Sequence, residues 1–276
     1  MSSSQRHQNS RRGQQTLHEA AASSLARQVP TGIILRYEEK NDQLKEFIAG
    51  NTLISYVMIN FSDALELLED HDSLDVILED WQVPIITATE YDADLGDRQR
   101  DDIRFVLGRI LHGIYVPDAG KVYGERSKKK QLGGLKEYKI RVDWLVREIE
   151  EQGWNINLLP LAKAMERWHF EKMLPWYREH GFRNFAFYAK QYYSDGNRFK
   201  DLQRHTCNLV NIVEPDNAFM IALNGPSHLS QLPPEVTGAS GLKQFILNCN
   251  YDNDQFRTWR KSLETHALGT HDFWGY

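Results

Sequence analysis

The feature that most constrains the fold is a strand-to-helix unit near the end of the chain. An apolar run, Ala218–Asn224 (AFMIALN), is followed by Gly225-Pro226-Ser227 and then by HLSQLPPEV. The run predicts a buried strand, the Gly-Pro pair a tight turn, and Ser227 the capped start of a short helix. The same order of apolar run, polar tip and helical segment recurs upstream. Such repeated βα units predict an α/β protein.

The strand candidates share apolar, β-rich composition and end at a polar residue or a turn. Helices are predicted between most of them: from Ser62, over 97–111, over 134–153 with Gly153 as C-cap, and over 167–181 with a break or kink at Pro175. About eight strands favour a single, irregular (β/α)8 TIM-like barrel over residues 29–276. The alternative, a doubly wound open sheet, usually carries a Gly-rich phosphate turn, and no such motif occurs. The candidates are 52–60, 74–81, 84–91, 112–120, 155–162, 182–190, 218–224 and 245–250, with 207–214 suiting strand or helix.

Composition narrows the class of protein. The 276 residues are 41% hydrophobic with a formal net charge of -5, enough for a sizeable core without a strongly basic surface. Residues 1–28 are rich in Ser, Gln and Arg, which predicts a disordered arm. Two cysteines, Cys207 and Cys249, predict neither a disulfide framework nor a cysteine zinc site, so we expect no metal or other cofactor. With no apolar stretch of membrane length and no signal peptide, a cytoplasmic protein is expected, of unspecified oligomeric state.

Carboxylates near predicted strand ends are the candidate catalytic groups. Strand ends converge on one mouth in a barrel, and paired carboxylates there suit glycosyl chemistry. We select Asp80 and Asp118 as the catalytic pair, although solvated loop acids are the ordinary alternative for each. The residues proposed to bind substrate are other strand tips and their neighbours: Glu79, Trp81, Glu90, Lys190, Asn224 and Gly225.

A basic, Gly-flanked segment, 124–134, follows the fourth strand candidate on the same face as these acids. Its cations, Arg126, Lys128, Lys129 and Lys130, are candidate contacts to the phosphates of a nucleic acid, with a solvated loop as the alternative.

The pairing of FRNFAFYAK with AFMIALNGPSHLSQLPPEVTGASG resembles the tRNA-guanine transglycosylase superfamily, and within it the short relatives linked to 7-deazaguanine insertion in DNA. The resemblance lies in a late strand, the turn Asn224-Gly225-Pro226, a short helix ending at Leu229–Pro233, and the small residues Gly238–Gly241. It implies a TIM barrel in which a carboxylate attacks a sugar carbon, guanine leaves, and a modified base enters. The family's zinc site of three cysteines and a histidine cannot be built from two cysteines.

The sequence therefore favours a transglycosylase-like enzyme that exchanges a guanine in DNA or tRNA for a free modified base. Two alternatives stay open at this point: a barrel that binds nucleic acid without catalysis, and a barrel enzyme acting on a small sugar or phosphate substrate. Enzymatic activity itself is left open by the sequence.

Overall fold

A computed structural model describes residues 29–89, 100–122, 126–194, 196, 198–223 and 225–267. The arm predicted for residues 1–28 lies outside them, as do Glu90 and Asn224. Within the described chain, eight parallel strands form one sheet in the order β5-β4-β3-β2-β1-β8-β7-β6. The strands are β1 (Gly32–Arg36), β2 (Tyr56–Asn60), β3 (Val83–Thr87), β4 (Gly113–Val116), β5 (Ile156–Leu158), β6 (Asn184–Tyr188), β7 (Asn217–Ile221) and β8 (Val236–Ser240).

The two outer strands of this order, β5 and β6, are joined by the residues that follow β5. Leu161 pairs in parallel with Ala186 of β6. The Ala162 N–H donates to the Ala186 carbonyl at 2.7 Å, and the Ala186 N–H donates to the Pro160 carbonyl at 2.9 Å. The sheet thus closes on itself in the strand order of a (β/α)8 barrel, with a short seam between β5 and β6. The predicted fold class is confirmed.

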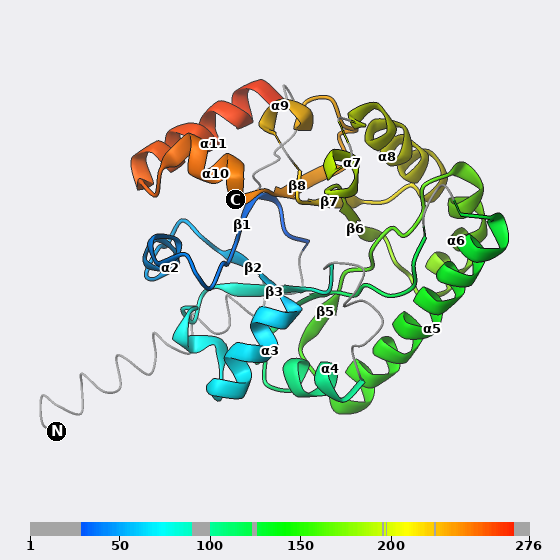
Figure 1. The fold of residues 1–276 in the computed structure, drawn as a ribbon, viewed down its shortest axis with the longest axis horizontal. Helices are drawn as coiled ribbons and strands as arrows, with labels where there is room; N and C mark the ends of the chain where they lie inside the picture. The colour runs from blue at the N-terminus through cyan, green and yellow to red at the C-terminus, as the bar shows by residue number, and fades with distance from the viewer. Residues whose placement is uncertain are drawn as a thin grey trace, which may run out of the picture.

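Helices surround the strands as an outer ring, as Figure 1 shows. A helix follows each strand, and three further helical elements directly follow another helix: η1 after α3, α8 after α7 and α11 after α10. In chain order they are α2 (Asp42–Ile48), α3 (Phe61–Asp70), the 3-10 turn η1 (Leu74–Val76), α4 (Arg100–Leu107), α5 (Lys128–Gln152), α6 (Arg167–Glu179), α7 (Gln191–Ser194), α8 (Phe199–Val213), α9 (Pro226–Leu229), α10 (Leu242–Cys249) and α11 (Asn253–Ala267).

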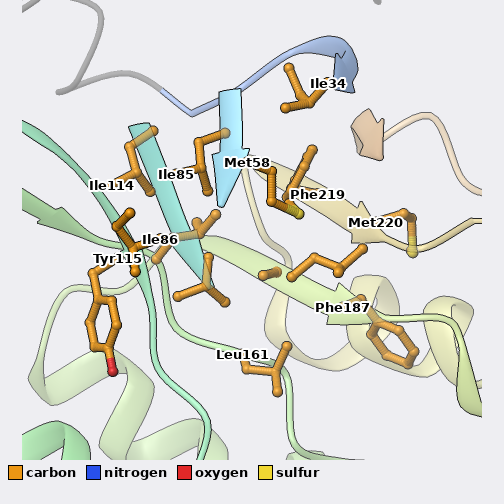
Figure 2. Close-up of a cluster of buried hydrophobic side chains, with 14 of the residues drawn as sticks. Ile34, Met58, Ile85, Ile86, Ile114, Tyr115, Leu161, Phe187, Phe219 and Met220 are labelled. Carbon is orange, nitrogen blue, oxygen red and sulfur yellow. The ribbon is translucent and has the colours of Figure 1, made fainter. Parts of the chain in front are cut away.

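The interior of the barrel is filled by apolar side chains. Met58, Ile85 and Phe219 lie together between the strands, whereas Tyr115 points away from them (Figure 2). Small residues complete this packing. A Cβ at Gly238 of β8 would lie 2.8 Å from the Phe219 ring and 2.5 Å from the Pro30 carbonyl oxygen. The Phe219 ring therefore occupies the space that a side chain on β8 would need.

The strand predicted over 245–250 is wrong. The eighth strand is Val236–Ser240 (VTGAS), not 245–250, and β1 was also not predicted. Residues 242–249 form helix α10, which buries Phe245 and Cys249, four positions apart, while Leu247 between them is 68% exposed. A strand would place all three on one face, so this burial pattern requires a helix.

The strand predicted over 74–81 is also wrong. Residues Leu74–Val76 form a 3-10 turn, with the Ser73 hydroxyl accepting the Asp75 N–H at 3.2 Å. Leu74 and Leu78 are the buried positions, a spacing of four rather than two. Two helix predictions change as well. The ambiguous segment 207–214 lies largely in α8, and α6 continues through Pro175.

Candidate active site at the carboxyl end of the barrel

A buried ion pair lies where β4 and β5 end. The Lys163 Nζ is 2.5 Å from the Asp118 Oδ1, and the two side chains are 14% and 5% exposed. Asp118 comes two residues after β4, and Lys163 follows the seam after β5. A charged pair this deeply placed needs good geometry to offset its desolvation, and active sites of this fold lie at this end of the strands. The pair is the best candidate for reactive groups in the described chain.

The loop that carries Asp118 is fixed by two glycines. Gly120 has φ +66°, and a Cβ there would lie 2.2 Å from the Gly134 carbonyl oxygen of α5. Conversely, a Cβ at Gly134 would lie 2.5 Å from the Lys121 carbonyl oxygen. Backbone therefore packs on backbone, and only glycine fits at both positions. This contact holds the Asp118 loop against the first turns of α5.

The segment that carries Lys163 is held in place by helix α5. Tyr138 of α5 is fully buried, and its hydroxyl oxygen accepts the Leu161 N–H at 2.6 Å. Burial raises the pKa of Tyr138 well above its usual value, with smaller contributions from Tyr177 and Asp118, so the phenol stays neutral. Together with the Ala162–Ala186 hydrogen bond, this contact fixes the backbone on which Lys163 stands.

His169 fixes the end of the same segment, just before and within the first turn of α6. The Nδ1 of buried His169 accepts the Met165 and Glu166 N–H groups, each at 3.2 Å. Its Nε2 lies 2.9 Å from the Gln131 Oε1, and the Gln131 amide donates to the Arg126 carbonyl at 2.8 Å. Two acceptor contacts at Nδ1 assign the neutral tautomer with a proton on Nε2. Burial lowers the pKa of His169 to about 4, consistent with a neutral ring.

Other polar side chains occupy the ends of neighbouring strands. The Arg36 guanidinium donates to the Asn60 side-chain oxygen, which joins the ends of β1 and β2. The hydroxyls of Thr87, the last residue of β3, and of Thr89 lie 2.7 Å apart and are buried. The carboxyl end of the barrel thus carries hydrogen-bonding groups above an apolar interior, an arrangement suited to orienting a polar ligand.

A small cavity of about 50 Å³ adjoins the ion pair. It is formed by the segments that follow three successive strands, β4, β5 and β6. Its lining includes Asp118, Lys163, Met165, Tyr188 and Gln191. A ligand placed in this cavity would contact both members of the ion pair.

The structure separates the two carboxylates that the sequence paired. Asp80 lies three residues before β3 begins, whereas Asp118 follows β4, so the two stand at opposite ends of a parallel barrel. Glu79 accepts the Gly50 N–H at 3.0 Å, before β2, and Trp81 is half-buried at the same amino end. The structure therefore does not bring Asp80 and Asp118 together, because the segment before Asp80 is a helical turn rather than a strand.

The remaining candidates lie nearer to Asp118. Lys190 follows β6 at the carboxyl end and is half-buried. Gly225 precedes α9 at the same end, but its φ of -164° is extended backbone that any residue adopts. The special role given to glycine there, close approach to a ligand, therefore gains no support from its conformation.

The basic segment is helical rather than a loop. Helix α5 begins at Lys128, six residues before the predicted start, and Lys128, Lys129 and Lys130 form its exposed first turn. Arg126 is exposed just before the Ser127 N-cap. These four cations share the carboxyl end of the barrel with Asp118, because α5 is entered from β4.

Sequence reasoning missed Lys163, Arg36 and Asn60. Lys163 stands in the run LPLAK, and an apolar run ending in a lone lysine is itself a strand-tip signal. Arg36 ends GIILR, a strand that was not assigned, and Asn60 was treated only as the end of 52–60.

Comparisons with known proteins leave the function open. No family model matches the sequence, and no curated protein matches it. Among solved structures, the chain is similar to HydG, a maturase of the FeFe hydrogenase, with 8% sequence identity and a TM-score of 0.42. The alignment covers 91% of this chain and 74% of that one. The barrel assignment rests on the strand order and the β5–β6 seam.

Two features are absent from the residues that the structure describes. These residues contain no cluster of three or more His, Cys, Asp or Glu side chains arranged to hold a metal ion. None of their helices combines the length and apolarity needed to cross a bilayer.

Proposed function

We propose that this chain is a barrel enzyme that exchanges the base of a nucleoside in DNA or RNA, with Asp118 and Lys163 as the reacting groups. The observation that supports it most is the nearly buried carboxylate–ammonium pair at the carboxyl end of the barrel. A carboxylate there can serve as a nucleophile toward a sugar carbon, and an adjacent ammonium can donate a proton to a leaving base.

In the proposed reaction, an Asp118 oxygen attacks C1′ of the nucleoside. A bond forms between that oxygen and C1′, and the C1′–N bond breaks with its electron pair passing to the departing base. Lys163 gives this base a proton. The incoming base then loses a proton to the Lys163 amine and attacks C1′, which releases the Asp118 carboxylate. Each step balances without an oxidant or reductant, and this scheme replaces the second carboxylate with a lysine.

Nucleic acid as the substrate is supported by the four exposed cations at the start of α5, which lie at the same end as Asp118. A second candidate, an enzyme acting on a small sugar or phosphate substrate, is favoured by a different observation. The cavity beside the ion pair is only about 50 Å³, so a base would have to displace the surrounding segments to enter.

The test is incubation of the purified chain with duplex DNA and with tRNA, each with labelled guanine or a labelled 7-deazaguanine base. The measurement is label retained in the polymer. We expect incorporation by the wild type, at least a hundredfold less with Asp118→Asn, and an unchanged rate with Asp80→Asn, which is the same substitution at the other end of the barrel. Absence of incorporation into both polymers, or equal activity of Asp118→Asn, would reject base exchange at this site.

A further inference from the structure

A groove of about 640 Å³ lies between α5, the loop after β4 that also carries Asp118, and the start of α4. It is strongly positive although the chain has a net charge of -5. One carboxylate, Glu137, lines it. Its cations come from three elements and are Arg100, Lys121, Arg126, Lys130 and Arg141. Three of these five, Arg100, Lys121 and Arg141, are not among the cations expected from the sequence.

Arg100 of α4 and Arg141 of α5 both lie near the indole ring of Trp144. The Cζ atoms of Arg100 and Arg141 lie 5.0 and 6.0 Å from the centroid of the buried Trp144 ring. Arg104 also approaches this ring, but its guanidinium forms a two-pronged hydrogen bond with Glu148. The indole thus holds the guanidiniums of Arg100 and Arg141 at fixed positions on the groove.

The surroundings of Arg141 disfavour its charged form. Its side chain is half-buried, and burial lowers its pKa. Tyr115 partly opposes this shift, and the positive charge of Arg100 adds a smaller lowering. An anion in the groove would relieve both effects, because it would replace lost hydration and offset the repulsion between the two guanidiniums.

Backbone groups also face this groove. Gly133 and Gly134 line it, and a Cβ at Gly133 would meet nothing within 4 Å. The first turn of the 25-residue helix α5 contributes Lys130, and its N-cap, Ser127, makes no side-chain capping hydrogen bond. The positive end of the helix dipole, near Lys130, adds to the side-chain charges.

We infer that this groove binds a phosphate group of a ligand, either a phosphodiester of a polynucleotide or a phosphate monoester. Five cations line the groove against one carboxylate, and three of the five are arginines, whose guanidiniums can form paired hydrogen bonds with phosphate oxygens. The inference concerns binding and stands independently of the reaction at Asp118.

The test uses two probes: a fluorescein-labelled single-stranded DNA 12-mer, followed by anisotropy, and inorganic pyrophosphate, followed by calorimetry. The groove variant is Lys121→Ala/Lys130→Ala. Its matched control is Lys136→Ala/Lys172→Ala, which removes the same charge from two exposed lysines that do not line the groove. Circular dichroism checks that both variants are folded.

We expect the groove variant to bind at least about tenfold more weakly than wild type, and the control to change less than about twofold. With the 12-mer, the slope of log K against log salt should also fall by about 1.4, roughly 0.7 for each lost phosphate contact. Pyrophosphate binding assigns the groove to a phosphate monoester or diphosphate, whereas 12-mer binding without pyrophosphate binding assigns it to a polynucleotide.

The inference is overturned if neither probe binds, or if the groove variant and its control weaken binding equally. Asp118→Asn separates this inference from the proposed function. That variant should bind both probes as the wild type does, so loss of exchange with retained binding leaves the groove assignment standing. If the groove variant binds both probes normally and exchange is also normal, only the groove assignment is rejected.

Discussion

Lys163 and Asp118 are 45 residues apart in the sequence, yet their charged atoms lie 2.5 Å apart at the carboxyl end of the barrel. The contact depends on the seam between β5 and β6, because the same residues that close the barrel carry Lys163. Barrel closure and assembly of the candidate site are therefore one structural event.

We expect the two charges to depend on each other energetically. Asp118→Asn should lower the free energy of unfolding by about 3 kcal/mol, because it leaves the Lys163 ammonium buried without its counter-charge. Lys163→Met should have a similar effect on Asp118. The double variant should lose less than the sum of the two, by about 0.5–3 kcal/mol, as measured by urea unfolding. Strict additivity would show that the pair does not interact in solution.

A second prediction concerns the hydroxyl at the seam. Tyr138→Phe should cost about 1–3 kcal/mol, because the buried Leu161 N–H loses its acceptor. Tyr177→Phe is the matched control. The Tyr177 hydroxyl is buried, and no hydrogen-bond partner for it is found within the part of the chain that the structure describes. Its removal should therefore be neutral or stabilising. Equal losses in thermal unfolding would contradict the seam contact.

Two glycines, one packed against backbone and one in open space, permit a third test. Gly120→Ala should lower the free energy of unfolding by more than about 2 kcal/mol, since φ is +66° and the new Cβ would lie 2.2 Å from the Gly134 carbonyl oxygen. Gly133→Ala, in α5, meets nothing within 4 Å and should stabilise by about 0.5–1 kcal/mol through helix propensity. Both values come from denaturant titration. A harmless Gly120→Ala would mean that the Asp118 loop is not packed on α5.

The fourth prediction is a pH dependence set by His169. Its folded-state pKa is about 4, against a usual 6.5, so the unfolded chain takes up a proton between these values and the folded chain does not. The stabilising contribution is complete above pH 6.5 and is lost as the pH falls toward 4, by up to about 1.4 kcal/mol per pH unit. His169→Gln should have a correspondingly shallower fall over this range. Identical slopes for the two proteins would contradict a neutral buried His169.

Much of the barrel follows from local sequence. Apolar runs that end in a polar residue, such as 52–60 and 218–224, place β2 and β7, and the total of eight strands agrees with the structure. The failures have a common cause in tertiary packing. Strand β8 contains Gly238 because the Phe219 ring fills the space beside it, so the strand lacks the large apolar residues by which strands are recognised. Conversely, residues 245–250 are apolar enough for a strand, but their buried side chains recur at helical spacing.

The candidate site was less predictable than the fold. Asp118 was selected because it follows a strand, and the structure places it at the carboxyl end. Asp80 was selected by the same rule, but the apolar run before it is a helical turn, which moves it to the other end. The run that ends in Lys163 marks a strand tip, but its pairing with Asp118 depends on the chain crossing the seam after β5, a long-range arrangement that no local pattern specifies.

The most direct test of the proposed reaction is capture of the sugar on Asp118. The chain is mixed with its polynucleotide substrate without an incoming base, denatured rapidly, digested and mapped by mass spectrometry. The proposal predicts a nucleotide adduct on the peptide that contains Asp118, absent from Asp118→Asn and present in Asp80→Asn. An exchange-active enzyme with no adduct on that peptide, or with an adduct on another residue, would contradict the assignment of Asp118 as the nucleophile.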